Sequence, residues 1–439
     1  MTASTLRQAI ADMPAALREG EVVACNGLVI EATGPDARLG EACELVSRHG
    51  GTPALAQVVG FRDGKVLLMP YGSIDGLRPG DRLRATGGSL RIPVGPALLG
   101  RVIDAFGQPI DGKGPLAASA HYEVHRAPIE PLRRRDDDQV LETGVRVIDT
   151  LVTMGKGQRL GVFAGSGVGK STLLGMVARH VRADVTVIGL IGERGREVGD
   201  FVSHALGPEG LRRAVVVAAT SDQPALVRAH ATHAVHAIAE YFRDQGADVM
   251  LMVDSVTRFA MAQREIGLAA GEPPTSRGYP PSVFNSLPRL VERGGALKSS
   301  GSVSCIYSVL VEGDDMNEPV ADHMRALLDG HIVLSRDLAH RGQLPAVDAL
   351  QSISRWIGRL ATPDEERLAS QARALLATFE ASRDLIDMGA WQRGANPQLD
   401  RAVDCVPGLL EIFRQSPRDS HGRQAGLHAL ARIVGEVAA

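Results

Sequence analysis

The feature that most restricts the fold of this 439-residue chain is a glycine-rich segment that lies between an apolar run and a helical run. The segment consists of Ala164, Gly165, Ser166, Gly167, Val168, Gly169, Lys170, Ser171 and Thr172. The apolar run 159–163 before it has the length of a buried strand, and the run 173–181 after it has helical spacing. Glycines in such a turn let successive backbone N–H groups surround phosphate oxygens, and the helix N-terminus adds its positive end. The segment therefore predicts a phosphate-binding loop, although Ala164 replaces the first glycine of the usual pattern.

Side chains at and near this loop predict a site for ATP and Mg²⁺. Lys170 supplies a positive charge to the phosphates, and Thr172 can donate a hydrogen bond to a phosphate oxygen. Ser171 stands where the hydroxyl ligand of Mg²⁺ belongs. The apolar run 249–253 ends in Asp254, a carboxylate expected to hold Mg²⁺ through water. Strand-terminal aspartates also cap helices, so this assignment depends on the phosphate loop.

A charged cluster follows another apolar run, 184–191. It contains Glu193, Arg194, Arg196 and Glu197, which is unusual for a solvated loop directly after a buried strand. Phosphoryl transfer requires positioning and electrostatic stabilisation more than covalent chemistry. We therefore expect Glu193 to orient and activate the attacking water and Arg194 to stabilise charge on the γ-phosphate. A structural ion-pair network is the alternative, and it is the better interpretation of Glu197.

The hydrophobic pattern changes along the chain and predicts four parts. Residues 1–19 carry apolar positions at helical spacing and form an N-terminal arm, with a buried packing helix as the alternative. Short β-rich runs and glycine-bearing turns in residues 20–91 are typical of a small β-barrel. In residues 92–361, apolar runs alternate with helical ones, which predicts an α/β domain with a mainly parallel sheet. Residues 362–439 are predicted to form a helical domain. Strands are expected at 159–163, 184–191, 214–218, 249–253 and 303–309, and the clearest C-terminal helices at 365–382 and 398–415.

Composition excludes several classes of protein. The net charge of -3 gives no bulk attraction to nucleic acid, and we expect no nucleic-acid partner. The four cysteines, Cys25, Cys43, Cys305 and Cys405, lack CxxC spacing, so neither a zinc site nor a disulfide framework is expected. No run approaches the ~18 apolar residues that a membrane span requires. We therefore expect a cytoplasmic protein with at most peripheral membrane contact.

Several segments resemble one known family. Gly192-Glu193-Arg194, the run 254–260 and the phosphate loop resemble the catalytic subunits of rotary ATPases. The runs 261–284 and 312–319 narrow the resemblance to the type III protein-export ATPases, which serve the bacterial flagellum and the related injectisome. The resemblance extends from about residue 20 to residue 415. It implies a RecA-like central domain, ATP hydrolysis with Mg²⁺, and a homohexamer that holds each nucleotide at a subunit boundary.

The resemblance also implies roles for residues outside the phosphate loop. The segment 350–355 matches the place of the family's arginine finger, so Arg355 is expected to act on the nucleotide of a neighbouring subunit. In the segment that closes over the adenine, the family usually has an aromatic residue before the proline. Leu344 stands there, so the base would be packed without stacking. The loop 271–282 resembles the family's pore-facing loop, with an ordinary connection as the alternative.

The partners implied by the resemblance are a central stalk protein, membrane proteins of the export gate, chaperone–substrate complexes and a stator-type regulatory protein on the arm 1–19. It also places the chain in the cytoplasm, peripheral at the inner membrane. The segments 85–90, 102–107 and 341–347 favour a flagellar system over an injectisome, which is the alternative.

Two other functions fit the sequence less well. A rotary ATP synthase subunit usually bears an acidic stretch in its C-terminal domain, and the sequence after Thr362 has none. A ring subunit that binds nucleotide without hydrolysing it would be expected to lack a water-activating glutamate, and Glu193 argues against that function.

Overall fold

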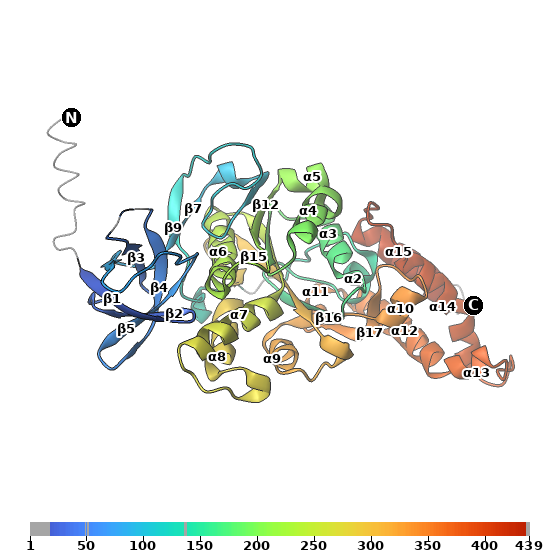
Figure 1. The fold of residues 1–439 in the computed structure, drawn as a ribbon. Coiled ribbons are helices and arrows are strands. Elements are labelled where there is room, and N and C mark those ends of the chain that lie inside the picture. The colour runs from blue at the N-terminus through green and yellow to red at the C-terminus, as the bar shows by residue number, and fades with distance from the viewer. Residues whose placement is uncertain (1–17, 49, 51, 136–137, 436–439) are drawn as a thin grey trace.

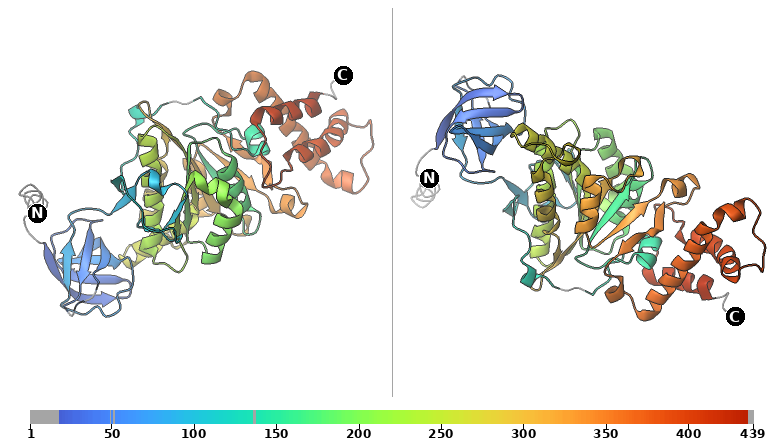
Figure 2. Two further views of the ribbon diagram at one scale, coloured as in Figure 1. Left: turned by 90° about the horizontal axis from the view of Figure 1, so that it is seen from above. Right: turned by 90° about the horizontal axis from the view of Figure 1, so that it is seen from below.

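The computed structural model describes residues 18–48, 50, 52–135 and 138–435. These residues form three parts along an elongated molecule: a β-barrel at one end, an α/β part in the middle and helices at the other end (Figures 1 and 2). The fold class predicted from the sequence is confirmed. The predicted arm 1–19 lies outside the described residues, apart from Arg18 and Glu19.

Six antiparallel strands close the barrel in the order β1-β2-β5-β4-β3-β6. They are β1 (Glu19–Asn26), β2 (Val29–Thr33), β3 (Ala42–Val46), β4 (Ala54–Arg62), β5 (Lys65–Pro70) and β6 (Arg82–Ala85). Buried aliphatic side chains such as Ile30, Leu68 and Leu83 fill the interior. Closure leaves this small sheet without a free edge.

A two-stranded antiparallel ribbon, β7 (Arg91–Val94) and β9 (Ala120–Glu123), follows the barrel. Between these strands in sequence lies β8 (Arg101–Ile103), which joins the edge of the central sheet instead. The sequence pattern did not separate this ribbon from the alternating β and α runs that follow.

The central sheet contains seven parallel strands in the order β16-β10-β15-β13-β11-β12-β8, with β17 antiparallel at the β16 edge. After β8 the strands are β10 (Arg159–Ala164), β11 (Val185–Ile191), β12 (Ala214–Ala219), β13 (Asp248–Asp254), β15 (Ser302–Leu310), β16 (Gly330–Leu334) and β17 (Val347–Ser354), while the short β14 (Gly295–Ala296) pairs with β15. The five strands expected from the sequence are each present, with bounds within one residue of the expected ones.

Helices cover both faces of the sheet (Figure 2), and strand residues alternate between two cores. In β11, for example, Val187 belongs to the core beneath α6, and Ile188 belongs to the core beneath α3. The helices of this part are α2 (Arg146–Leu151), α3 (Lys170–His180), α4 (Gly195–Asp200), α5 (Gly207–Arg212), α6 (Ala225–Asp244), α7 (Val256–Ala269), α8 (Pro281–Val291), α9 (Pro319–Leu327), α10 (Arg336–His340) and α11 (Ile357–Leu360), with a π-helical turn at Phe201–Leu206 and short 3-10 turns that include Ser276–Gly278 and Glu312–Asp314.

The C-terminal part consists of α12 (Pro363–Ala381), α13 (Arg383–Asp387), α14 (Pro397–Phe413) and α15 (Arg423–Gly435). A capping box of Thr362 and Glu365 starts α12, and Arg423 pairs with both carboxylate oxygens of Glu365 at 2.7 and 3.0 Å. Arg373 fastens α12 to the central part by donating hydrogen bonds to the carbonyls of Leu151 and Ser352, at 2.8 and 3.1 Å. None of the described helices is both long and apolar enough to cross a bilayer.

Candidate active site

The predicted phosphate loop lies at the carboxyl end of β10, next to the ends of β15 and β13. Carboxyl ends of parallel strands are where α/β proteins bind ligands. Gly167 and Gly169 adopt left-handed backbone conformations, with φ of 80° and 94°, which only glycine adopts readily. Helix α3 begins at Lys170, three residues earlier than its apolar pattern indicated, because Gly169 supplies the turn before it. Ser171 and Thr172 therefore lie in the first turn of α3, beside the loop that they were predicted to serve.

The ammonium group of Lys170 lies between two acidic side chains. It contacts Oδ1 of Asp254 and lies 3.5 Å from Oε1 of Glu193. Asp254 is the last residue of β13 and is 2% exposed, and its Oδ1 also accepts a hydrogen bond from Ser308 at 2.6 Å. The structure thus brings together three residues that were singled out from separate segments of the sequence.

The backbone at Gly192 directs Glu193 toward this cluster. Gly192 has a φ of 72° and donates a hydrogen bond to the carbonyl of Ala219 at 2.6 Å. A Cβ at position 192 would lie 3.0 Å from Cβ of Arg258, so glycine is also favoured sterically. The turn ties two neighbouring strand ends together and leaves the Glu193 side chain beside Lys170.

Burial raises the pKa of Glu193 to about 7. Lys170 opposes this rise, whereas the negative charges of Asp254 and Glu197 reinforce it. Glu193 donates a hydrogen bond to Glu197, and that bond lowers the pKa of Glu197. A carboxylate whose pKa lies near neutrality is suited to accept a proton at physiological pH.

The structure places Arg194 away from this cluster. Its side chain is 82% exposed and pairs with Glu197 at 3.8 Å. Another arginine, Arg258 on α7, packs against Gly192, and its Nε is buried without a hydrogen-bond partner. Arg258 was not assigned a role from the sequence. The sequence signal for Arg258 was its position as the first cation after Asp254.

Arg355 lies at the amino ends of the parallel strands, whereas the phosphate loop lies at their carboxyl ends. It follows β17, whose last residue, Ser354, pairs with Gly330 at the start of β16. Arg355 is exposed and donates a hydrogen bond to the carbonyl of Arg325 at 3.2 Å. Within one chain, Arg355 therefore does not meet Lys170.

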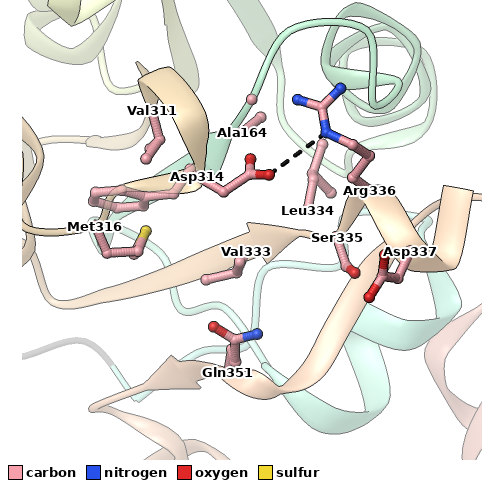
Figure 3. Close-up of a pocket in the computed structure, with 12 residues that line it drawn as sticks. Ala164, Val311, Asp314, Met316, Val333, Leu334, Ser335, Arg336, Asp337 and Gln351 are labelled. Carbon is pink, nitrogen blue, oxygen red and sulfur yellow. Dashed lines mark hydrogen bonds and ion pairs between the residues drawn. The ribbon is translucent and has the colours of Figure 1, made fainter.

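Two neighbouring cavities extend from the phosphate loop toward the C-terminal helices. The first, of about 230 Å³, is bounded by the backbone of Ala164 and Gly165 and by the ion pair of Asp314 with Arg336, which are 3.5 Å apart (Figure 3). The second, of about 330 Å³, shares Gln351 with the first.

The second cavity is the candidate site for a base. Its lining includes Pro345 and, from α14, Leu410 and Phe413. Leu344, predicted to pack on the base, is 49% exposed and accepts a hydrogen bond from the backbone of Gln415 at 2.9 Å. Phe413 supplies an aromatic ring that was not assigned from the sequence, where it lies inside the predicted helix 398–415.

The residues at the loop suit a hard cation that is bound with phosphate. Among the residues that the structure describes, no group of three or more His, Cys, Asp or Glu side chains could hold a metal alone. Mg²⁺ typically uses one or two protein oxygens, together with waters and substrate phosphates. The hydroxyl of Ser171 and the carboxylate of Asp254 are oxygen donors of that kind.

Models of known families match three successive parts of the chain. The model of the ATP synthase alpha/beta family, beta-barrel domain, matches residues 22–87, and that of the nucleotide-binding domain of the same family matches residues 144–354. The model of the T3SS EscN ATPase C-terminal domain matches residues 361–432.

Whole proteins and solved structures resemble the chain over nearly its full length. It is 50% identical to the flagellum-specific ATP synthase of Bacillus subtilis, over 95% of each chain. It is 47% identical to the type 3 secretion system ATPase of Xanthomonas euvesicatoria, over 99% of this chain and 98% of that one. The assembled ATPase EscN of enteropathogenic E. coli superposes with a TM-score of 0.89 at 41% identity, over 95% of this chain and 100% of EscN. EscN in complex with its central stalk EscO gives a TM-score of 0.87 at 40% identity, with the same coverage.

Proposed function

This chain belongs to the ATP synthase alpha/beta family and, within it, to the type III export ATPases, and we propose that it hydrolyses MgATP at sites shared between neighbouring subunits to drive protein export. The observation that carries the proposal is the cluster of Lys170, Asp254 and Glu193 at the phosphate loop. It contains a cation for the phosphates, a carboxylate for metal-bound water and a carboxylate able to accept a proton.

Each residue of the cluster has a separate task in the proposed reaction. The backbone of the loop 164–172 and Lys170 bind the phosphates, and Thr172 adds a hydrogen bond. Glu193 orients the attacking water and takes its proton at a carboxylate oxygen. Because burial raises the pKa of Glu193 to about 7, the proton is accepted more readily than by an ordinary exposed glutamate.

Ser171 and Asp254 would hold Mg²⁺, which when bound supplies neutralisation of the charge on the phosphate oxygens. Within the chain, the Lys170 ammonium contacts Asp254 and neutralises part of its negative charge. Lys170 is expected to leave Asp254 for the phosphates when the nucleotide enters.

Arg355 is proposed to complete the site of a neighbouring subunit. Its exposure and its distance from its own phosphate loop support action in trans. Arg194 is exposed as well, so its contact with the γ-phosphate, which was predicted from sequence, requires a change in its side-chain conformation. The proposed assembly is a homohexamer around a central stalk protein, supported by the likeness to EscN in its assembled state and in complex with EscO.

The base is proposed to lie in the second cavity, which Pro345 and Phe413 line. Leu344, which precedes Pro345 and is exposed, is proposed to cover the base. The ring of Phe413 offers an aromatic contact that Leu344 cannot give. Because Phe413 belongs to α14, nucleotide binding would be transmitted to the C-terminal helices.

We propose export of flagellar components as the process, with secretion by an injectisome as the alternative. The other proposed partners are export-gate membrane proteins, chaperone–substrate complexes and a stator-type protein on residues 1–19, at a cytoplasmic position peripheral to the inner membrane. The loop 271–282 is proposed to face the pore. Proteins that co-purify with the chain would distinguish flagellar from injectisome partners.

The substitution Glu193→Gln tests the proposed chemistry. It keeps the shape of the side chain and removes the proton acceptor, so turnover should fall at least a hundredfold while binding of a fluorescent ATP analogue is retained. Glu209→Gln is the matched control, since Glu209 is 87% exposed and lies on α5. Near-normal hydrolysis by Glu193→Gln would exclude Glu193 as the base.

A further inference from the structure

Ser308 lies on the middle one of three neighbouring strands, two of which lead into the active site. It belongs to β15, which runs between β13, the strand that ends in Asp254, and β10, the strand that leads into the phosphate loop. Ser308 pairs with Val162 on β10, and the preceding residue, Tyr307, pairs with Val253 on β13. Ser308 is therefore level with Asp254, and its side chain is fully buried.

The hydroxyl of Ser308 is hydrogen-bonded to the carboxylate of Asp254. Its Oγ donates a hydrogen bond of 2.6 Å to Oδ1, the same oxygen that Lys170 contacts. Both partners are almost completely buried, so water cannot replace this bond if it is lost. A hydrogen bond to an ionised carboxylate is also stronger than one between neutral groups. Both contacts fall on Oδ1 of Asp254.

We propose that Ser308 is a positioning residue for Asp254, which holds the carboxylate in the orientation needed for metal-dependent nucleotide binding. The inference rests on the proposed role of Asp254 as the carboxylate that holds Mg²⁺ through water. When Lys170 turns toward the phosphates, the hydrogen bond from Ser308 remains and keeps the Asp254 carboxylate from rotating. Residues that orient metal-binding groups typically contribute 10- to 100-fold to metal affinity or activity.

Ser304 provides a matched control on the same strand and the same face. It is 1% exposed, and its Oγ accepts a hydrogen bond from the backbone of Gly157 at 2.8 Å. Ser304 precedes Ser308 by four residues on β15, toward the amino end of the strand and away from Asp254. Removing its hydroxyl tests the effect of a lost buried hydrogen bond in β15 without touching the carboxylate.

The experiment measures the dissociation constant of a fluorescent ADP analogue in Mg²⁺ and in EDTA, for the full chain and its variants. The ratio of the two constants reports the contribution of Mg²⁺ to binding, independently of turnover. We expect Ser308→Ala to lower this ratio about tenfold, with little change in EDTA. Ser304→Ala should leave the ratio unchanged, and Ser308→Thr, which keeps the hydroxyl, should restore it. Ser308→Cys, nearly isosteric but a weak donor, should resemble Ser308→Ala and serves if the alanine variant fails to fold.

Asp254→Asn separates this inference from the proposed function. If Asp254→Asn lowers the ratio but Ser308→Ala and Ser308→Cys do not, the positioning role of Ser308 is refuted and the role of Asp254 stands. If Asp254→Asn retains the full ratio, the proposed role of Asp254 fails. A loss in Ser304→Ala as large as that in Ser308→Ala would also overturn the inference, because it would be a general effect of β15 packing.

Discussion

A cluster of histidines between α6 and the β7–β9 region, in which His230 and His236 are buried, should make the fold sensitive to acid. His230, His233 and His236 lie on α6, and His125 follows β9. The rings of His125 and His233 are 4.4 Å apart, and His230 stacks on Phe106 at 5.2 Å. The cations and carboxylates packed around the cluster include Arg293, which pairs with Glu240 at 2.7 Å and lies 3.4 Å from Nδ1 of His233, and Arg126, which pairs with Glu240 and Asp244.

Burial is the main cause of lowered pKa values in this cluster. It lowers the pKa of His230 and of His236 to about 3 and that of His125 to about 4. An unfolded histidine titrates near ~6.5, so below that pH the unfolded chain binds more protons than the folded one. The stability that each neutral histidine contributes is therefore fully present above pH ~6.5 and is lost as the pH falls. Between pH 7.5 and 5.5, one such histidine costs about 1.4 kcal/mol, which is RT ln 10.

Comparison of the wild type with His230→Phe isolates this effect. The pKa of Asp149 is raised to about 6 and that of Glu193 to about 7, mainly by burial, so both carboxyl groups oppose the histidines over the same pH range. The contributions of Asp149 and Glu193 to the pH dependence of stability are the same in both proteins, so they cancel in the comparison. Nδ1 of His230 has no hydrogen-bond partner, so an apolar ring leaves no partner of that atom unsatisfied.

Urea unfolding at pH 7.5 and pH 5.5, at one protein concentration, measures the difference. The wild type should lose about 1.4 kcal/mol more than His230→Phe between the two pH values. His230→Gln checks that the effect follows the titrating group rather than the ring. His421→Phe, at an exposed position, should lose as much as the wild type. Equal losses in the wild type and both His230 variants would refute the reasoning.

Three further expectations concern the site and its assembly. Since Glu193 must be ionised to accept a proton, kcat/KM should fall about tenfold per pH unit below an apparent pKa of about 7, and a profile flat from pH 6 to 8 would contradict this. Arg355→Ala should lower turnover about 10³-fold and abolish the rise of specific activity with protein concentration, whereas Arg359→Ala, whose guanidinium lies 3.8 Å from the ring centroid of Trp356, should retain both. Thr362→Ala removes the cap of α12 and should reduce the free energy of unfolding by about 1 kcal/mol, which denaturant titration can measure.

Local sequence patterns predicted the buried strands and the phosphate loop. The strands at 159–163 and 249–253 are buried on both faces of the sheet, and such strands appear in a sequence as unbroken apolar runs. The phosphate loop was predictable because its glycines satisfy a backbone requirement at Gly167 and Gly169. The ribbon β7–β9 was not separable, since each of its strands has four residues and pairs across 25 intervening residues.

Only those site residues that carry a local sequence signal could be predicted. Glu193 and Asp254 each follow an apolar run, and parallel pairing of β11 with β13 brings the two strand ends together. Ser308 gave no signal, because an isolated serine in an apolar strand does not reveal which strand lies beside it. Phe413 was equally hidden, since a buried aromatic residue in a helix is usually part of the core. Both residues acquire a meaning only when long-range contacts are known.

Charge balance gives a reason why the proposed site should work between subunits. At the phosphate loop, the Lys170 ammonium lies against the carboxylates of both Asp254 and Glu193, and Glu197 is hydrogen-bonded to the latter. ATP would bring further negative charge into this region, and bound Mg²⁺ compensates only part of it. A guanidinium from a neighbouring subunit would supply the missing positive charge at the moment when charge on the transferred phosphoryl group develops. Since Arg355 lies exposed at the end of the strands opposite to its own phosphate loop, the isolated chain should bind nucleotide but hydrolyse it slowly, and turnover should depend on contact between subunits.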